Sequence, residues 1–159
     1  MKRFIAFILA ISFTGITYFT YLNFRVNTVI AVHQTGNIAV ILIDHLPPTE
    51  SARMKWWIAN RESIDTKYHI MTDDPKGMLS YFIYEYGDGY MKEGKEDRLC
   101  LDDVPPPNNC VDKNILLHTW RGPEGATLFS FPNSTYIANR DGSISRVNDT
   151  VKIVEPDEK

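Results

Sequence analysis

The first twenty-four residues, MKRFIAFILAISFTGITYFTYLNF (1–24), decide where the rest of this chain must fold. Nineteen of them, residues 4–22, carry no charged side chain. At 1.5 Å of rise per residue they would form about 28 Å of helix, close to the roughly 30 Å of a bilayer's hydrocarbon core. We therefore predict an N-terminal membrane anchor over residues 1–24 that crosses the bilayer with residues 4–22.

The charges and aromatic side chains around this run predict its direction. Lys2 and Arg3 precede it, and basic residues stay on the cytoplasmic side of a membrane. Aromatic residues, which favour the membrane interface, gather at its other end. These features predict a single pass through a bacterial inner membrane, with the C-terminal domain in the periplasm. A cleaved signal peptide is the alternative, but the small-residue pattern Ser12-Phe13-Thr14 is poor and the apolar run continues past it.

The remaining chain predicts one domain, residues 25–150, and a flexible tail, residues 151–159. Two β-branched runs, 28–33 and 38–43, flank the polar residues 34–37, which is typical of a hairpin and not of a second membrane span. Thr49 can cap a helix that runs to about Asp65. Further strands are expected at 78–86, 114–121, 127–131, 135–139 and 143–147, and a long surface excursion at 92–109. The fold class is α+β, an antiparallel sheet with one main packed helix.

The charge of the exported part limits its partners. The whole chain has a net charge of −3, so without Lys2 and Arg3 the part from residue 25 onward has −5. An acidic surface is repelled by nucleic acid, which argues against a nucleic-acid partner. The same surface suits a basic protein partner, although a net charge of this size is also ordinary for a soluble domain.

Cys100 and Cys110 are the only cysteines, and both lie on the expected periplasmic side. In an oxidising compartment we expect a disulfide between them. Closing a loop of this length corresponds to roughly 3 kcal/mol in the chain-entropy model. A pair of metal ligands is the alternative, but two cysteines without a nearby histidine make a poor zinc site. The four histidines are scattered, and no pair has the i, i+4 spacing of a helical metal site, so we expect no metal site. The sequence has no Gly-x-Ser-x-Gly, no Ser-x-x-Lys and no phosphate-binding glycine-rich loop, so we expect no cofactor and no catalytic motif.

The acidic residues and the paired tryptophans each allow two interpretations. Glu85, Asp88, Glu93 and Asp97 could provide the carboxylate pair of an enzyme acting on envelope glycan, but neighbouring cations favour a solvated surface. Trp56 and Trp57 are about 100° apart on a helix, so both cannot lie at the centre of one buried face. We expect Trp57 to be buried and Trp56 to cover the rim of the sheet or to take part in binding.

These segments together resemble a family known in enterobacteria as domain of unknown function 943, over roughly residues 28–147. The most specific run begins at Tyr86-Gly87-Asp88-Gly89-Tyr90. The other matching segments are Ala31-Val32-His33, Pro48-Thr49, Lys55-Trp56-Trp57 with Asn60, Lys67-Tyr68-His69-Ile70, Lys92-Glu93-Gly94-Lys95, Asp97-Arg98-Leu99-Cys100, Asn109-Cys110 and Lys113-Asn114. This chain has Glu85 where the family pattern has an aspartate, which weakens a catalytic role for that acid.

The resemblance implies one anchoring segment, no established enzymatic activity and accessory genes near toxin-delivery loci. Our first hypothesis is therefore a tethered periplasmic binding protein, an immunity protein that blocks a basic toxic effector by occlusion. The residues expected on its binding surface are Trp56, Asp88, Tyr90, Glu93, Glu96 and Asp97. The glycan-acting enzyme and a structural subunit of an envelope assembly are the alternatives.

Overall fold

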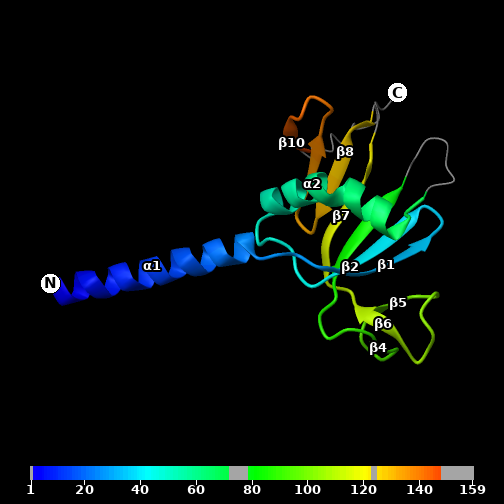
Figure 1. Ribbon diagram of the computed structural model, residues 1–159, viewed down its shortest axis with the longest axis horizontal. Coiled ribbons are helices and arrows are strands. Elements are labelled where there is room, and N and C mark those ends of the chain that lie inside the picture. The colour runs from blue at the N-terminus through cyan, green and yellow to red at the C-terminus, as the bar shows by residue number, and fades with distance from the viewer. Residues whose placement is uncertain (1, 72–78, 123–124, 148–159) are drawn as a thin grey trace, which may run out of the picture.

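The structure is a computed structural model that describes residues 2–71, 79–122 and 125–147. The predicted tail at 151–159, the loop at 72–77 and the expected strand start at residue 78 lie outside the described residues. The N-terminal helix α1, Lys2–Phe24, projects away from the rest of the molecule (Figure 1). Its residues Arg3–Leu22 form one candidate membrane span, and none of that span is buried against the protein.

A seven-stranded sheet forms the body of the molecule, in the order β1-β2-β3-β7-β8-β9-β10. Its strands are β1 (Val29–Thr35), β2 (Ile38–Ile43), β3 (Ser80–Glu85), β7 (Ile115–Arg121), β8 (Thr127–Phe131), β9 (Ser134–Ala138) and β10 (Ile144–Arg146). The first hairpin forms as predicted, with Thr35 paired to Ile38 across the turn. The later strands begin and end within a residue or two of the expected positions.

The sheet is mostly antiparallel, but β2 and β3 run parallel. Parallel neighbours need a crossover, and helix α2, Glu50–Tyr68, provides it. The side chain of Thr49 accepts a hydrogen bond from the backbone N–H of Ala52, so the predicted N-cap is confirmed. The helix continues three residues beyond Asp65 and ends where His69 adopts a left-handed conformation.

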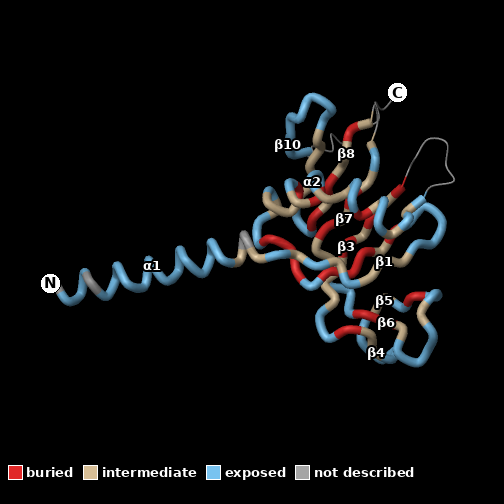
Figure 2. The backbone as a smooth tube through the Cα atoms, viewed as in Figure 1, coloured by how far each residue is buried: buried red, intermediate tan, exposed pale blue. Residues whose placement is uncertain are grey.

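Alternate residues of β2 point to opposite faces of the sheet and join two separate cores. On one face Ile41 and Ile43 pack in a cluster that includes Met54, Trp57 and Ile64 of α2. Trp57 is 1% exposed, as expected from the helical pattern. Figure 2 shows the buried stretches concentrated where α2 crosses the sheet strands. On the other face Leu42 packs with Leu101 and Val111 of the chain between β3 and β7.

That intervening chain was expected to be a surface excursion, and this prediction is wrong. It folds into a second sheet of three strands in the order β4-β6-β5. The strands are β4 (Met91–Lys92), β5 (Arg98–Cys100) and β6 (Asn108–Asp112). The sequence did not indicate these strands because they are short, charged and flanked by prolines. Burial of Leu101 and Val111 against the main sheet holds them in place. Two packed layers therefore result on this side of the molecule (Figure 1).

Candidate functional site

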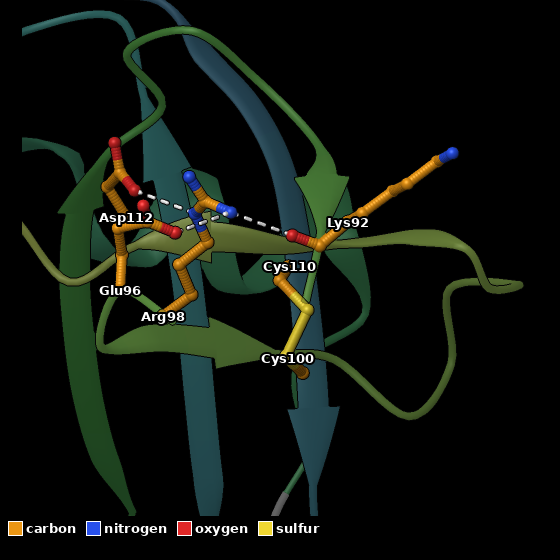
Figure 3. Close-up of polar contacts among 6 residues, drawn as sticks. All are labelled: Lys92, Glu96, Arg98, Cys100, Cys110 and Asp112. Atoms are coloured by element: carbon orange, nitrogen blue, oxygen red, sulfur yellow. Dashed lines mark hydrogen bonds and ion pairs between the residues drawn. A yellow bond between two sulfur atoms is a disulfide. The ribbon is translucent and has the colours of Figure 1, made fainter. Parts of the chain in front are cut away.

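The small sheet is held together by Arg98, the first residue of β5. Its Nε donates to Asp112 Oδ1 at 3.1 Å, and its Nη1 donates to the carbonyl oxygen of Lys92 at 2.8 Å. The same Nη1 lies 3.4 Å from Glu96 Oε2. Figure 3 shows the guanidinium among these three partners. Because one side chain binds β4, β6 and the loop before β5, it fixes the shape of an otherwise minimal sheet.

A disulfide closes the same sheet. Cys100 and Cys110 are directly paired residues of β5 and β6, and their sulfur atoms are bonded, which confirms the expected bridge. Cys110 is fully buried, whereas Cys100 is exposed. Figure 3 places the bridge beside the Arg98 cluster. Covalent closure and the arginine cluster together make the small sheet a preorganised platform.

A histidine of the main sheet joins this platform to β1. His33 Nδ1 lies 2.7 Å from Asp103 Oδ2, and His33 Nε2 lies 2.7 Å from the Tyr90 hydroxyl. Because an ionised carboxylate only accepts hydrogen bonds, Nδ1 donates to Asp103. Burial, followed by the nearby Tyr86 and Asp103, raises the pKa of Tyr90, so its hydroxyl keeps the proton with which it can donate to Nε2. The chain Asp103–His33–Tyr90 therefore fastens the loop after β5 to the main sheet.

The outer surface of this platform is acidic. Residues 86–113 contain seven carboxylates and four cations, a net charge of −3. Two of the cations are engaged locally, because Arg98 binds Glu96 and Asp112 and Lys113 binds Asp97. Asp88, Glu93 and Asp102 are exposed and form no ion pair among the described residues. These three carboxylates therefore remain available to an external cation.

The residues predicted for the binding surface thus have different roles in the structure. Asp88 and Glu93 are exposed on the small-sheet side, whereas Glu96 and Asp97 are in ion pairs. The Tyr90 ring packs in the core beneath the small sheet, edge-on to Tyr86 at 5.4 Å between ring centroids. Trp56 belongs to the core on the α2 side, across the main sheet. The structure therefore does not bring Trp56 together with the acidic residues.

The half-buried Trp56 instead lines a groove of about 300 Å³ between α2 and the segment that follows α1. Asn60, Ser63 and Lys67 of the helix line the same groove. Opposite them lie the residues of the segment 26–29. Trp56 is therefore both a rim residue of the core and part of a concave surface.

Of the four carboxylates considered for catalysis, two are held by a neighbouring side chain and two are exposed. Glu85, at the end of β3, accepts a hydrogen bond from the side-chain amide of Asn114, and Asp97 binds Lys113. Asp88 and Glu93 are exposed. Within the described residues no group of three or more histidine, cysteine or acidic side chains is arranged to hold a metal ion.

The residues that build the platform have no signature in the local sequence. His33 and Asp103 are 70 positions apart, and no local pattern relates them. Asp102 was not singled out either, although it is one of the exposed carboxylates. Arg98 lies in a charged stretch that is typical of a solvated surface, yet its side chain is only 17% exposed.

One comparison with known proteins identifies a family. A family model described as "Enterobacterial putative membrane protein (DUF943)" matches residues 1–148, which include α1 and both sheets. No curated protein and no solved structure matches the chain.

Proposed function

The chain belongs to the DUF943 family of enterobacterial proteins, and from this premise we propose that it is a membrane-tethered periplasmic binding module. Its acidic, disulfide-closed small sheet would occlude a basic protein partner. The observation that carries this proposal is the set of free carboxylates, Asp88, Glu93 and Asp102, on a platform fixed by Arg98 and the Cys100–Cys110 bridge. A rigid surface loses little conformational entropy on docking, so little of the favourable electrostatic free energy of binding is offset.

We further propose that the partner is a toxic effector delivered to the envelope, which would make the chain an immunity protein. Occlusion requires a complementary surface but no reaction, and the candidate face offers charge and rigidity instead of a catalytic arrangement. Complementary charge also accelerates encounter, which would favour capture of an effector before it reaches its target. Anchoring in the inner membrane would keep the module where such an effector acts.

The test is protection of growing cells. Each gene encoded beside this one would be expressed with an export signal, with and without the full chain. The surface variant Asp88→Asn with Glu93→Gln removes two exposed carboxylates. Its matched control, Glu62→Gln with Asp141→Asn, removes two exposed carboxylates outside the small sheet. Wild type and control should protect cells from one neighbour, whereas the surface variant should lose protection.

Two results would contradict the proposal. Full protection by the surface variant, at equal abundance in the membrane fraction, would mean that another surface binds the effector. Absence of protection against every neighbour would argue against an immunity protein. Stable copurification with several membrane proteins, without any protection, would instead support a structural subunit of an envelope assembly.

A further inference from the structure

The segment that leaves α1 is fastened to the folded body almost at once. Asn27 Nδ2 donates to the His45 carbonyl oxygen at 3.1 Å. The next residue, Thr28, exchanges hydrogen bonds with Asp44, and Tyr68 of α2 donates to the carbonyl oxygen of Val29 at 3.1 Å. Only residues 25 and 26 separate the end of α1 from the first of these contacts.

Such a short connection limits how far the body can move from the membrane. Three residues from Phe24 to Asn27 span at most about 10 Å even when fully extended. The headgroup layer on one side of a bilayer is roughly 5–7 Å thick, from the difference between total and hydrocarbon thickness. If α1 spans the membrane, the residues around Asn27 must therefore lie in or directly against the headgroups.

The groove beside Trp56 opens at this same point. Val26, Asn27 and Thr28 form one wall, and Trp56, Asn60 and Lys67 contribute to the other. The lining combines amides and hydroxyls with apolar surface. It also includes an indole ring, a group that prefers the membrane interface. Val26 at its edge is 84% exposed, so its isopropyl group is open to an apolar neighbour from outside the chain.

Two cations accompany the groove. Lys67 lines it and forms no ion pair with a carboxylate in the described part of the chain, while its Nζ lies 4.9 Å from the Tyr68 ring centroid. Arg25 lies immediately before Val26, and its Nε is buried without a hydrogen-bond partner among the described residues. Both cations suit a phosphate group placed at the groove between residues 26–29 and α2.

We propose that this groove binds the headgroup of a phospholipid from the leaflet that α1 enters on leaving the membrane core, and that this contact seats the body on the bilayer. Lys67 and Arg25 would hold the phosphate, the polar lining would contact the glycerol and headgroup oxygens, and Trp56 would lie at the interface. The inference rests on membrane anchorage and not on the proposed effector, because the groove and the small sheet lie on opposite faces of the main sheet.

Fluorescence quenching tests the proposal on the full chain, reconstituted in vesicles of phosphatidylethanolamine and phosphatidylglycerol. Some of the lipid carries a nitroxide on its headgroup, or in a parallel sample at the end of an acyl chain. The headgroup label should quench part of the tryptophan emission of the wild type. Trp56→Phe should lose most of that quenching, whereas Trp120→Phe should retain it. Lys67→Gln should weaken it, because one of the two phosphate contacts is removed.

A pair of insertions provides a second measurement. A flexible Gly-Ser insertion between Arg25 and Val26 should lift the body and reduce quenching, while the same insertion in the Asp141–Gly142 turn should not. A cooperative urea-unfolding transition shows that each variant has folded. Equal quenching of the wild type and Trp56→Phe, or stronger quenching from the acyl-chain label, would overturn the proposal. Loss of protection from an effector with normal quenching would refute only the proposed function.

Discussion

His118, on β7, occupies the middle of an aromatic stack on the face of the main sheet opposite α2. Its ring lies 4.0 Å from the ring centroid of Phe82 and 4.5 Å from that of Trp120, nearly parallel to both. The Nε2 atom is buried and has no hydrogen-bond partner among the described residues. Burial lowers the pKa of His118, because the charged imidazolium is poorly solvated there. This side chain therefore stacks well but leaves a polar atom unsatisfied.

We predict that His118→Phe stabilises the protein by about 1 kcal/mol at neutral pH, because it retains the stack and removes an unsatisfied buried nitrogen. The gain should increase on acidification. The folded pKa of His118 lies below the unfolded value near 6.5, so the unfolded state binds the proton more tightly. Wild-type stability should therefore be retained above about pH 6.5 and fall as the pH drops from there through the folded pKa.

Urea unfolding of the full chain in detergent, at about pH 7 and about pH 5, measures both effects. His69→Asn is the control: it removes an exposed histidine, and asparagine tolerates the left-handed conformation found at this position. It provides the matched loss of one histidine without touching the aromatic stack. An identical pH dependence in wild type and His118→Phe would show that His118 does not contribute to it.

Single residues differ in how far the sequence predicts their environment. Helical geometry separates adjacent side chains by about 100°, so burial of Trp57 and an edge position for Trp56 followed directly from their spacing. The engagement of His33 with Asp103 depends on the packing of one sheet on another. A contact of that kind has no local signature, which is why the residues beneath the acidic face were missed.

At the scale of elements, the Thr49 side chain caps the start of α2. Its Oγ1 accepts from the Ala52 N–H at 3.3 Å, in the first turn of α2. We predict that Thr49→Ala lowers the free energy of unfolding by about 1 kcal/mol, as for other helix caps. Thr66→Ala, in the last turns of the same helix, should be neutral or mildly stabilising because alanine is the better helix former. Equal unfolding free energies for Thr49→Ala and wild type would mean that packing of α2 alone fixes its start.

Strand prediction succeeded where hydrophobic periodicity was clear and failed where it was absent. The first hairpin and β8 show β-branched or apolar alternation, and the structure confirms them. The strands β4 and β5 have two and three residues, too few to establish a period. Their pairing depends on the Arg98 contacts, on the disulfide and on packing against Leu42 of the main sheet, and none of these interactions appears as a periodic pattern. The parallel pairing of β2 with β3 was likewise decided by the α2 crossover and not by either strand.

The disulfide makes a separate prediction for the small sheet. Its cysteines are ten residues apart, and removing the bridge with Cys100→Ser and Cys110→Ser should lower the free energy of unfolding by about 2–4 kcal/mol. Cys110 is fully buried, so a serine hydroxyl there adds a desolvation cost that the bridge does not explain. Cys100→Ala with Cys110→Ala separates the two effects.

Partner binding should weaken in both double variants, because the platform loses its preorganisation. Thiol labelling of protein from the periplasmic side, under denaturing and non-reducing conditions, establishes the starting state. Two reactive thiols would show that the bridge does not form in cells. The acidic face would then lack covalent closure.

At the scale of the whole molecule, the two proposed binding sites lie on opposite faces of the main sheet. α2 and the groove beside Trp56 occupy one face, and the acidic small sheet occupies the other. Attachment of residues 27–29 within a few residues of α1 would hold both faces at the bilayer surface. A partner of the acidic face must then approach along the membrane, which suits an effector that acts on the membrane or on the adjacent cell wall.

The orientation of α1 is the prediction on which this arrangement depends. Lys2 and Arg3 lie at the N-terminal end of the span and one cation, Arg25, follows it closely, so the charge bias favours a cytoplasmic N-terminus. Alkaline phosphatase fused after Lys159 should be active, a fluorescent protein that matures only in the cytoplasm should be dark there, and the chain should stay in the membrane fraction. Lys2→Gln with Arg3→Gln should reduce phosphatase activity, because it removes that bias.

Recovery of a soluble form beginning near residue 15 would show instead that residues 4–22 are a cleaved signal, and the body would then lose its position at the membrane.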